Sequence, residues 1–143
     1  MSNLRQITDA RHVSAPPLVL VADDDPDTRF LFRTALELRG YCVVEAADGE
    51  ERVGAAETVR PDLILMDGSL PGLSGLEAAR QIRQSGDLGH VPIVFISGHA
   101  GAAFIALARE AGCDEYFVKP LDLAQLDDVV KKYCGNAARA LGV

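Results

Sequence analysis

The sequence lacks the features that mark membrane proteins, secreted proteins and nucleic-acid-binding proteins. It contains no run of Lys or Arg, and its formal net charge is −7. Because a protein that binds nucleic acid neutralises phosphates with clustered basic side chains, direct binding to DNA or RNA is disfavoured. No apolar stretch approaches the length of a membrane-spanning helix, and the N-terminus has no apolar signal-peptide core. We therefore expect a cytoplasmic protein that does not insert into membranes.

Cysteine is also scarce. The three cysteines, Cys42, Cys113 and Cys134, are odd in number and far apart in the sequence. This pattern excludes a disulfide framework and the usual spacing of metal ligands. We expect the three thiols to be small, buried hydrophobic side chains in a reducing compartment.

The remaining composition is that of one globular domain. The chain has 143 residues, of which 48% are hydrophobic and 24% are charged. Residues 1–17 are polar, show no periodicity and end in Ala-Pro-Pro, so we expect a flexible leader. We place the domain at residues 18–135 and a short tail at 136–143. Because so few residues follow the last expected helix, we expect no output domain after it.

Short apolar runs, most of them rich in Val, Ile or Leu, predict strands that are buried on both faces of a parallel sheet. These runs are Leu18–Ala22, Tyr41–Ala46, Leu63–Met66, Ile93–Ile96 and Glu115–Val118. They alternate with helical patterns, which predicts a doubly wound α/β fold. We expect a five-stranded parallel sheet in the common order 2-1-3-4-5, with helices on both faces.

The helical patterns have recognisable starts and stops. They cover Pro26–Arg39, about Glu50–Val59, Gly75–Gln84, Ala102–Ala111, and a last helix that begins after Asp122 and ends at Gly135. In the first of these, Asp25 suits the N-cap and Gly40 suits the C-terminal stop. Its apolar side consists of Leu31, Phe32, Ala35 and Leu38. The residues opposite are Arg29, Arg33 and Glu37.

Polar side chains stand at the carboxyl ends of four expected strands. They are Asp23, Asp24 and Asp25 after the first strand, Asp67 after the third, Ser97 after the fourth and Lys119 after the fifth. Ligands of doubly wound folds bind at this edge of the sheet. Two like charges about 4 Å apart repel by roughly 4 kcal/mol at an effective dielectric near 20. Crowded carboxylates at this edge therefore either protonate or bind a hard cation.

Oxygen ligands without His or Cys favour Mg²⁺ (or Mn²⁺) as that cation. With a cation bound, Lys119 and the Ser97 hydroxyl would stabilise oxygens of a transferring phosphoryl group, and Asp67 would act as the nucleophile. Simpler interpretations stay open for single residues. Asp25 is the natural helix cap, and Asp67 taken alone would also suit a turn before Gly68. The joint occurrence at four strand ends is what favours a phosphoryl site.

Four segments resemble the receiver domains of two-component signalling. They are LVLVADDD at Leu18–Asp25, DLILMDGSLPGLSGLE at Asp62–Glu77, PIVFISG at Pro92–Gly98 and YFVKP at Tyr116–Pro120. The resemblance covers about residues 18–133 and is specific because the four segments occur in order. It implies a stand-alone, chemotaxis-type response regulator that accepts a phosphoryl group from a phosphohistidine donor in a Mg²⁺-dependent reaction.

The same resemblance implies roles for particular residues. Asp67 would be the phosphoacceptor, and Asp23 and Asp24 would hold Mg²⁺ together with Asp67 and the backbone carbonyl of Ser69. The remaining assignments are Lys119 as the phosphate-pairing lysine, Ser97 as the switch hydroxyl, Tyr116 as the switch aromatic, and Lys119-Pro120 as the site of a cis peptide bond.

Two glycines depart from the family pattern. Gly68 follows the acceptor where a larger apolar residue is usual, and Gly98 follows Ser97 where Ala is common. Both leave space beside the phosphoryl site and loosen the backbone, so they bear on phosphoryl lifetime and on switching. His99 either tunes the access of water or is a plain loop residue.

Three other functions remain to be weighed. A degenerate receiver that only binds partners is disfavoured because all five residues of the phosphoryl site are present. They are Asp23, Asp24, Asp67, Ser97 and Lys119. A flavodoxin-like cofactor protein would need a Ser-, Thr- or Gly-rich loop after the first strand, where this chain has Asp-Asp-Asp-Pro-Asp. A phosphohydrolase would need a general acid or base beside the nucleophile. We expect self-catalysed phosphoryl acceptance and slow autodephosphorylation rather than a turnover enzyme.

The expected partners are a histidine kinase or histidine phosphotransfer protein and a downstream protein target. A homodimer through the 102–111 helix and the fifth strand is a further expectation. The side of that helix expected to pack on the sheet consists of Phe104, Leu107, Ala108 and Ala111. The side expected to face solvent, and to form the output surface, consists of Ala102, Ile105, Ala106 and Arg109.

Overall fold

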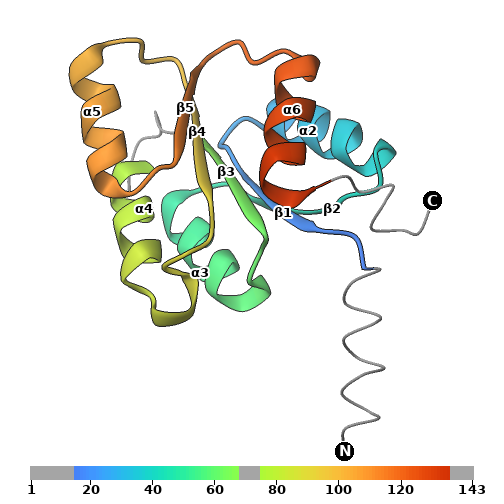
Figure 1. The fold of residues 1–143 in the computed structure, drawn as a ribbon, viewed down its shortest axis with the longest axis horizontal. Coiled ribbons are helices and arrows are strands. Elements are labelled where there is room, and N and C mark those ends of the chain that lie inside the picture. Colours follow the sequence, from blue (N-terminus) through green and yellow to red (C-terminus); the bar gives the residue numbers. More distant parts are fainter. Residues whose placement is uncertain (1–14, 68–74, 136–143) are drawn as a thin grey trace, which may run out of the picture.

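The computed structural model describes residues 15–67 and 75–135, and these residues form the predicted sheet. Its strands are β1 (Leu18–Ala22), β2 (Cys42–Ala46), β3 (Leu63–Asp67), β4 (Ile93–Ser97) and β5 (Glu115–Val118). All pair in parallel in the order β2-β1-β3-β4-β5, which confirms the predicted strand order (Figure 1). The expected leader, except residues 15–17, and the expected tail lie outside the described residues.

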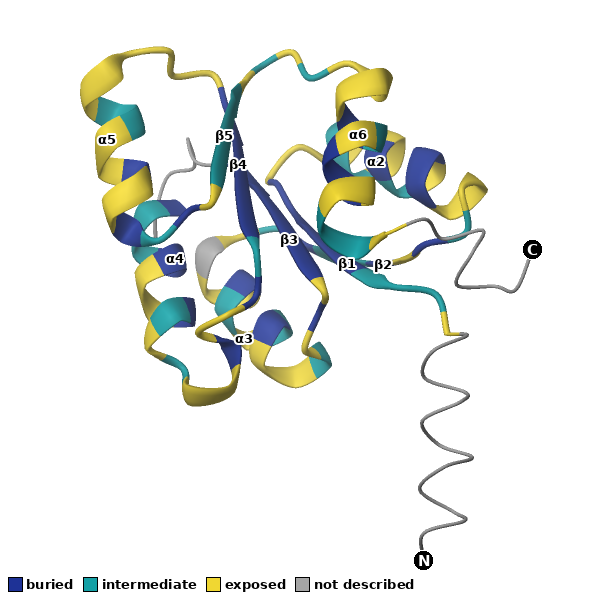
Figure 2. Cartoon of the chain, in the orientation of Figure 1, coloured by how far each residue is buried: buried dark blue, intermediate teal, exposed yellow. Residues whose placement is uncertain are grey.

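Two layers of helices cover the sheet. The helices are α2 (Pro26–Leu38), α3 (Gly49–Val59), α4 (Gly75–Gln84), α5 (Ala102–Ala111) and α6 (Leu123–Cys134). On one face α2 and α6 form a core with alternate strand residues, and on the other face α3, α4 and α5 do so (Figure 1). Both faces of the central strands are therefore covered, and Figure 2 shows these strands as buried. Such burial explains why their sequences are apolar almost throughout.

Two strand ends differ from the prediction in a way that concerns function. The sequence pattern places Asp67 and Ser97 just after their strands, whereas both are the last residue of a strand, paired with Ile96 and Val118 respectively. Their backbones are therefore held by the sheet. A short 3₁₀ helix, η1 (Gly86–Leu88), was not predicted.

Helix α2 begins at Pro26 as predicted and ends one residue earlier, at Leu38, but it presents a different side to the sheet. The Asp25 side chain caps it by accepting the Asp27 N–H at 3.2 Å, and Gly40 follows its end with a positive φ of 93°. Leu36 is fully buried, whereas Leu31 and Leu38 are 50% and 81% exposed. The predicted apolar side was therefore wrong for these two leucines, because the stripe that packs on the sheet is centred on Phe32, Ala35 and Leu36.

Helix α5 also differs from the prediction in its packing. Ala108 and Ala111 are buried as expected, but Leu107 is 43% exposed. Ile105, predicted to face solvent, is half-buried. The exposed side carries Glu110 beside Arg109, so it is more polar than predicted. Compared with the prediction, α5 is rotated about its axis. Ile105 is therefore partly covered, and Leu107 lies at the edge of the buried stripe.

The cysteines follow the prediction in part. Cys113 is buried and Cys134 is half-buried, and burial raises the pKa of both thiols, that of Cys134 to about 12. Cys42 is exposed, because it begins the edge strand β2, so its expected burial was wrong. None of the described helices is long and apolar enough to span a membrane.

Candidate functional site

The buried polar side chains gather at one edge of the sheet. In the described part of the chain, the buried polar and charged residues are Asp23, Arg52, Asp67 and Ser97. Asp23 directly follows β1, while Asp67 and Ser97 end β3 and β4. Because these strands are parallel neighbours, their carboxyl ends meet at the same edge. Burying charge in this way is costly unless the groups are paired or bind an ion, so this edge is the candidate site.

The acidic cluster consists of Asp23, Asp24 and Asp67. One carboxylate oxygen from each residue lies within 4.8 Å of the other two. Asp23 and Asp67 are 4% and 5% exposed, whereas Asp24 is exposed. Three carboxylate donors at this spacing are the hard oxygen ligands that Mg²⁺ prefers, and the open side at Asp24 leaves room for water ligands. The residues present therefore fit a divalent cation.

Lys119 links the two buried carboxylates of the cluster. Its Nζ donates to Asp67 Oδ2 at 2.9 Å and to Asp23 Oδ2 at 3.3 Å. Burial disfavours the charged ammonium, but the hydrogen bond that it donates to Asp67 and the two negative charges outweigh this, so the pKa of Lys119 is raised. The Lys119-Pro120 peptide bond is cis, as the resemblance implied.

The pKa of Asp23 is raised, mainly by burial. The Asp25 N–H, which donates to Asp23 Oδ1 at 2.9 Å, acts in the opposite direction. The negative charge of Asp67 raises the pKa further, and Lys119 lowers it. Burial and the neighbouring Asp67 thus disfavour the ionised form of Asp23, and a bound cation would stabilise that form.

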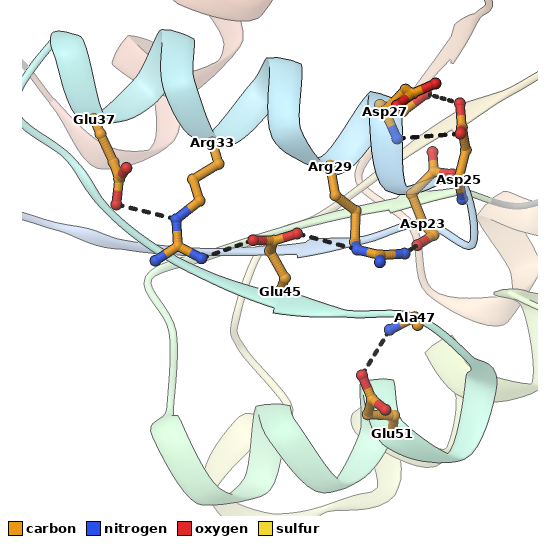
Figure 3. A network of polar contacts seen from close by, with 10 residues as sticks. Asp23, Asp25, Asp27, Arg29, Arg33, Glu37, Glu45, Ala47 and Glu51 are labelled. Carbon is orange, nitrogen blue, oxygen red and sulfur yellow. Dashed lines mark hydrogen bonds and ion pairs between the residues drawn. The ribbon is translucent and has the colours of Figure 1, made fainter.

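A row of ion pairs positions the main chain of Asp23. Arg29 of α2 donates to the Asp23 carbonyl oxygen at 2.6 Å and pairs with Glu45 of β2 at 3.1 Å. Glu45 also pairs with Arg33 at 2.7 Å, and Arg33 pairs with Glu37 at 3.2 Å (Figure 3). The sequence pattern placed Arg29 on the solvent side of its helix, but its side chain is only 18% exposed. In the sequence, the only hint of this ion pair was Glu45, an acidic residue within an otherwise apolar strand.

Arg52 of α3 positions the main chain of the other buried aspartate. Its Nη1 donates to the carbonyl oxygen of Asp67 at 2.8 Å, and the side chain is fully buried. Sequence reasoning missed this residue, since one arginine in a weakly amphipathic helix has no distinguishing pattern.

The predicted switch residues lie on neighbouring strands: Ser97 ends β4, and Tyr116 in the first half of β5 pairs with Phe95, two residues before Ser97. Ser97 is fully buried, and its Oγ accepts the His99 N–H at 3.1 Å. Tyr116 is half-buried and its hydroxyl donates to the His99 carbonyl at 2.7 Å, toward the surface. The exposed His99 ring stacks on Phe104 of α5, with centroids 4.5 Å apart. These contacts join the strand end that carries Ser97 to the start of α5.

Ser69, which was predicted to supply a metal ligand, and Gly68 both lie outside the described residues. The structure brings together the other predicted site residues except that Tyr116 lies on the outer side, away from the acidic cluster.

Comparison with known proteins gives the family. Residues 19–131 match the response regulator receiver domain. The polar-differentiation response regulator DivK of Brucella anthropi is 33% identical over 122 residues, which cover 85% of this chain and 99% of the relative. The chain therefore belongs to the response-regulator receiver domain family of two-component signalling.

Solved structures of receiver proteins agree with this family assignment. The receiver domain of a sensor histidine kinase from Pseudomonas aeruginosa, which has a magnesium ion coordinated in its active site cleft, is 33% identical with a TM-score of 0.78. It is matched over 85% of this chain and 99% of its own. The chemotaxis protein CheY4 of Vibrio cholerae is 26% identical with a TM-score of 0.79, over 83% of this chain and 99% of its own.

Proposed function

We propose that this receiver domain is a phosphoryl-accepting switch whose acceptor is Asp67. The observation that carries the proposal is the buried Asp67 carboxylate, which shares Lys119 with Asp23 and lies in a cluster of three acidic side chains. The neighbours of Asp67 are the Lys119 ammonium and two further carboxylates. The ammonium suits the charge of a phosphoryl group, and the carboxylates suit a divalent cation.

The donor is a phosphohistidine of a histidine kinase or of a histidine phosphotransfer protein. A carboxylate oxygen of Asp67 attacks the phosphorus, the P–O bond forms and the P–N bond breaks. The leaving imidazole nitrogen keeps the electron pair and takes up a proton. Lys119, which already contacts Asp67, balances charge on the phosphoryl oxygens, and the Ser97 hydroxyl donates to one of them.

Asp23, Asp24, Asp67 and the backbone carbonyl of Ser69 would hold Mg²⁺ or Mn²⁺. When bound, the cation neutralises negative charge on the phosphoryl oxygens and on the carboxylates. The donor set of the acidic cluster supports this assignment, as does the magnesium ion in the Pseudomonas receiver.

The signal leaves through protein contacts or onward phosphotransfer, and slow autodephosphorylation resets the domain. Movement of Ser97 toward a phosphoryl oxygen would change its contact with His99, and Tyr116 would turn inward from its bond to the His99 carbonyl. Helix α5 would respond because His99 stacks on Phe104. We further propose a downstream protein target, contact between copies through α5 and β5, a folded domain at 18–135, and a cytoplasmic location.

Intact-mass analysis after incubation with acetyl phosphate and Mg²⁺ tests the acceptor. The wild type should gain the mass of one phosphoryl group, and Asp67→Asn or a chelator should abolish the gain. Asp87→Asn is the matched control, since its side chain is 71% exposed in η1, away from the site, and it should behave as the wild type. Persistent labelling of Asp67→Asn would overturn the assignment.

A further inference from the structure

Among the described residues, Arg52 has the one fully buried charged side chain, and the phosphoryl-transfer steps above do not use its charge. It reaches from α3 to the end of β3, where Nη1 donates to the Asp67 carbonyl. Its Nε and Nη2 are also buried and have no hydrogen-bond acceptor. A guanidinium carries five N–H donors in a rigid fork, so most of its capacity is unused here.

The positive charge of Arg52 also lacks a direct ion-pair partner among the described residues. None of the described carboxylates pairs with it, in contrast to Lys119, which pairs with both Asp23 and Asp67. Burial lowers the pKa of Arg52, but the negative charges of Asp67, Asp23 and Asp24 oppose this, and an arginine stays protonated at neutral pH. A permanent positive charge therefore lies close enough to the acidic cluster to interact with it.

A buried donor without an acceptor is unfavourable, so some compensation is expected when the protein works. Simple anchoring of α3 to β3 would need only the bond from Nη1. It would be served as well by a neutral donor, without the cost of burying a charge. Two further donors and a full charge beside the main chain of the acceptor residue are what an arriving oxyanion requires.

We propose that Arg52 is a resident cation of the phosphorylation site, which offsets part of the charge of the acidic cluster and binds the phosphoryl group through its unpartnered donors. This inference rests on the proposed function and adds to it. Arg52 should weaken the binding of the divalent cation to the empty site, because like charges repel. It should strengthen the binding of the phosphoryl group once that group is present.

The two effects have opposite signs, and this separates a role of the charge from a structural role. Arg52→Met keeps the length of the side chain and removes the charge, whereas Arg52→Lys keeps the charge. Arg80→Met removes a half-exposed arginine from the surface of α4 and controls for net charge. Binding of Mn²⁺ to the unphosphorylated proteins is read from the paramagnetic resonance signal of the free ion. Binding of trifluoroberyllate, a phosphoryl mimic, is measured at saturating Mg²⁺.

Arg52→Met should bind Mn²⁺ about fivefold more tightly than the wild type, the size expected for removing one charge several ångströms from a divalent ion in a largely hydrated site. It should bind trifluoroberyllate more weakly. Arg52→Lys and Arg80→Met should stay near the wild type in the Mn²⁺ measurement. If Arg52→Met changes both affinities in the same direction, or neither, the proposal is overturned.

A measurement on the wild type covers the case in which the variants do not fold. The Arg52 Nε–H resonance should move downfield when Mg²⁺ and trifluoroberyllate are added, as a hydrogen bond forms. An unmoved resonance in a protein that binds the mimic would overturn the proposal. Failure of the proposed function is distinguishable, because the wild type would then show no phosphoryl gain at Asp67, whatever Mn²⁺ does.

Discussion

At the scale of single residues, two arginines from different helices hold the main chain of the site. Arg29 donates to the carbonyl of Asp23, and Arg52 donates to the carbonyl of Asp67. Hydrogen bonds from a charged donor are stronger than those between neutral groups. The two buried carboxylates of the acidic cluster are therefore presented from backbone that is fixed on both sides of the sheet.

Glu45 should make the protein sensitive to acid. Its hydrogen bond from Arg33, followed by that from Arg29, lowers the pKa of the Glu45 carboxyl below its ordinary value. A lowered pKa stabilises the fold above the pKa of the unfolded chain, and this contribution disappears as the pH falls through the folded pKa. Glu45→Gln should thus lower the free energy of unfolding at pH 7 by about 1 kcal/mol and by less near pH 3.

Urea unfolding at the two pH values measures this difference. Glu110→Gln is the control, because Glu110 is exposed on α5 and should show a smaller effect at both pH values. An equal loss for Glu45→Gln at pH 7 and pH 3 would show that the ion pairs of Figure 3 are not the cause.

Asp24 is the exposed member of the acidic cluster and should contribute to cation binding rather than to the helix cap. The Asp25 side chain fills the capping role by accepting from Asp27 N and Thr28 Oγ1. Asp24→Asn should therefore weaken Mg²⁺ binding, followed by magnetic-resonance shifts during titration. Asp27→Asn, an exposed neighbour in the first turn of α2, should change it less. Equal affinities for the wild type and Asp24→Asn would remove Asp24 from the ligand set.

The acidic residues of the site could be predicted from sequence, whereas the arginines could not. Asp23, Asp24 and Asp67 follow apolar runs that predict buried strands, and the sheet order then brings them together. Arg29 and Arg52 lie in helical patterns where an arginine usually faces solvent. Their burial depends on partners from other elements, which no local pattern records.

At the scale of elements, the sequence predicted where strands and helices begin and end better than which side of a helix packs on the sheet. The expected strands agree with the observed ones to within one residue at each end. In α2, however, Leu31 is exposed and Leu36 is buried, because the facing strands select which stripe of the helix packs. Both residues are leucines of one helix, and composition alone does not distinguish them.

The exposed side of α5 should form the output surface, with Leu107 as its main apolar contact. Leu107 is 43% exposed, while Ile105 is half-buried and is a poor probe of the surface. Leu107→Glu and Ala106→Lys should each reduce self-association or partner binding in the presence of trifluoroberyllate. Their free energies of unfolding should change little, because exposed positions tolerate charge.

Sedimentation with and without the mimic measures self-association. Leu38→Glu is the matched control, since Leu38 is 81% exposed on α2, which packs on the opposite face of the sheet. Normal phosphorylation together with unchanged association in both α5 variants would place the output surface elsewhere.

At the scale of the whole molecule, strands that alternate with helices predict the doubly wound sheet, and the order 2-1-3-4-5 brings the site together. The proposed switch would couple this site to a helix on one face only. Coupling between phosphoryl group and output surface cannot exceed the difference in stabilisation of the two conformations, typically about 1–3 kcal/mol. Phosphorylation is therefore expected to shift the equilibrium between two conformations of α5 only modestly.

The most direct test of the account is the chemical identity of the phosphorylated residue. Borohydride reduces an aspartyl phosphate to homoserine, so the reduced protein is digested and each aspartate is assayed by mass spectrometry. The account predicts homoserine at position 67 alone, dependent on the phosphoryl donor and on the divalent cation. Homoserine at Asp23 or Asp24, or a stable phosphate on Ser97 with Asp67 unmodified, would contradict it.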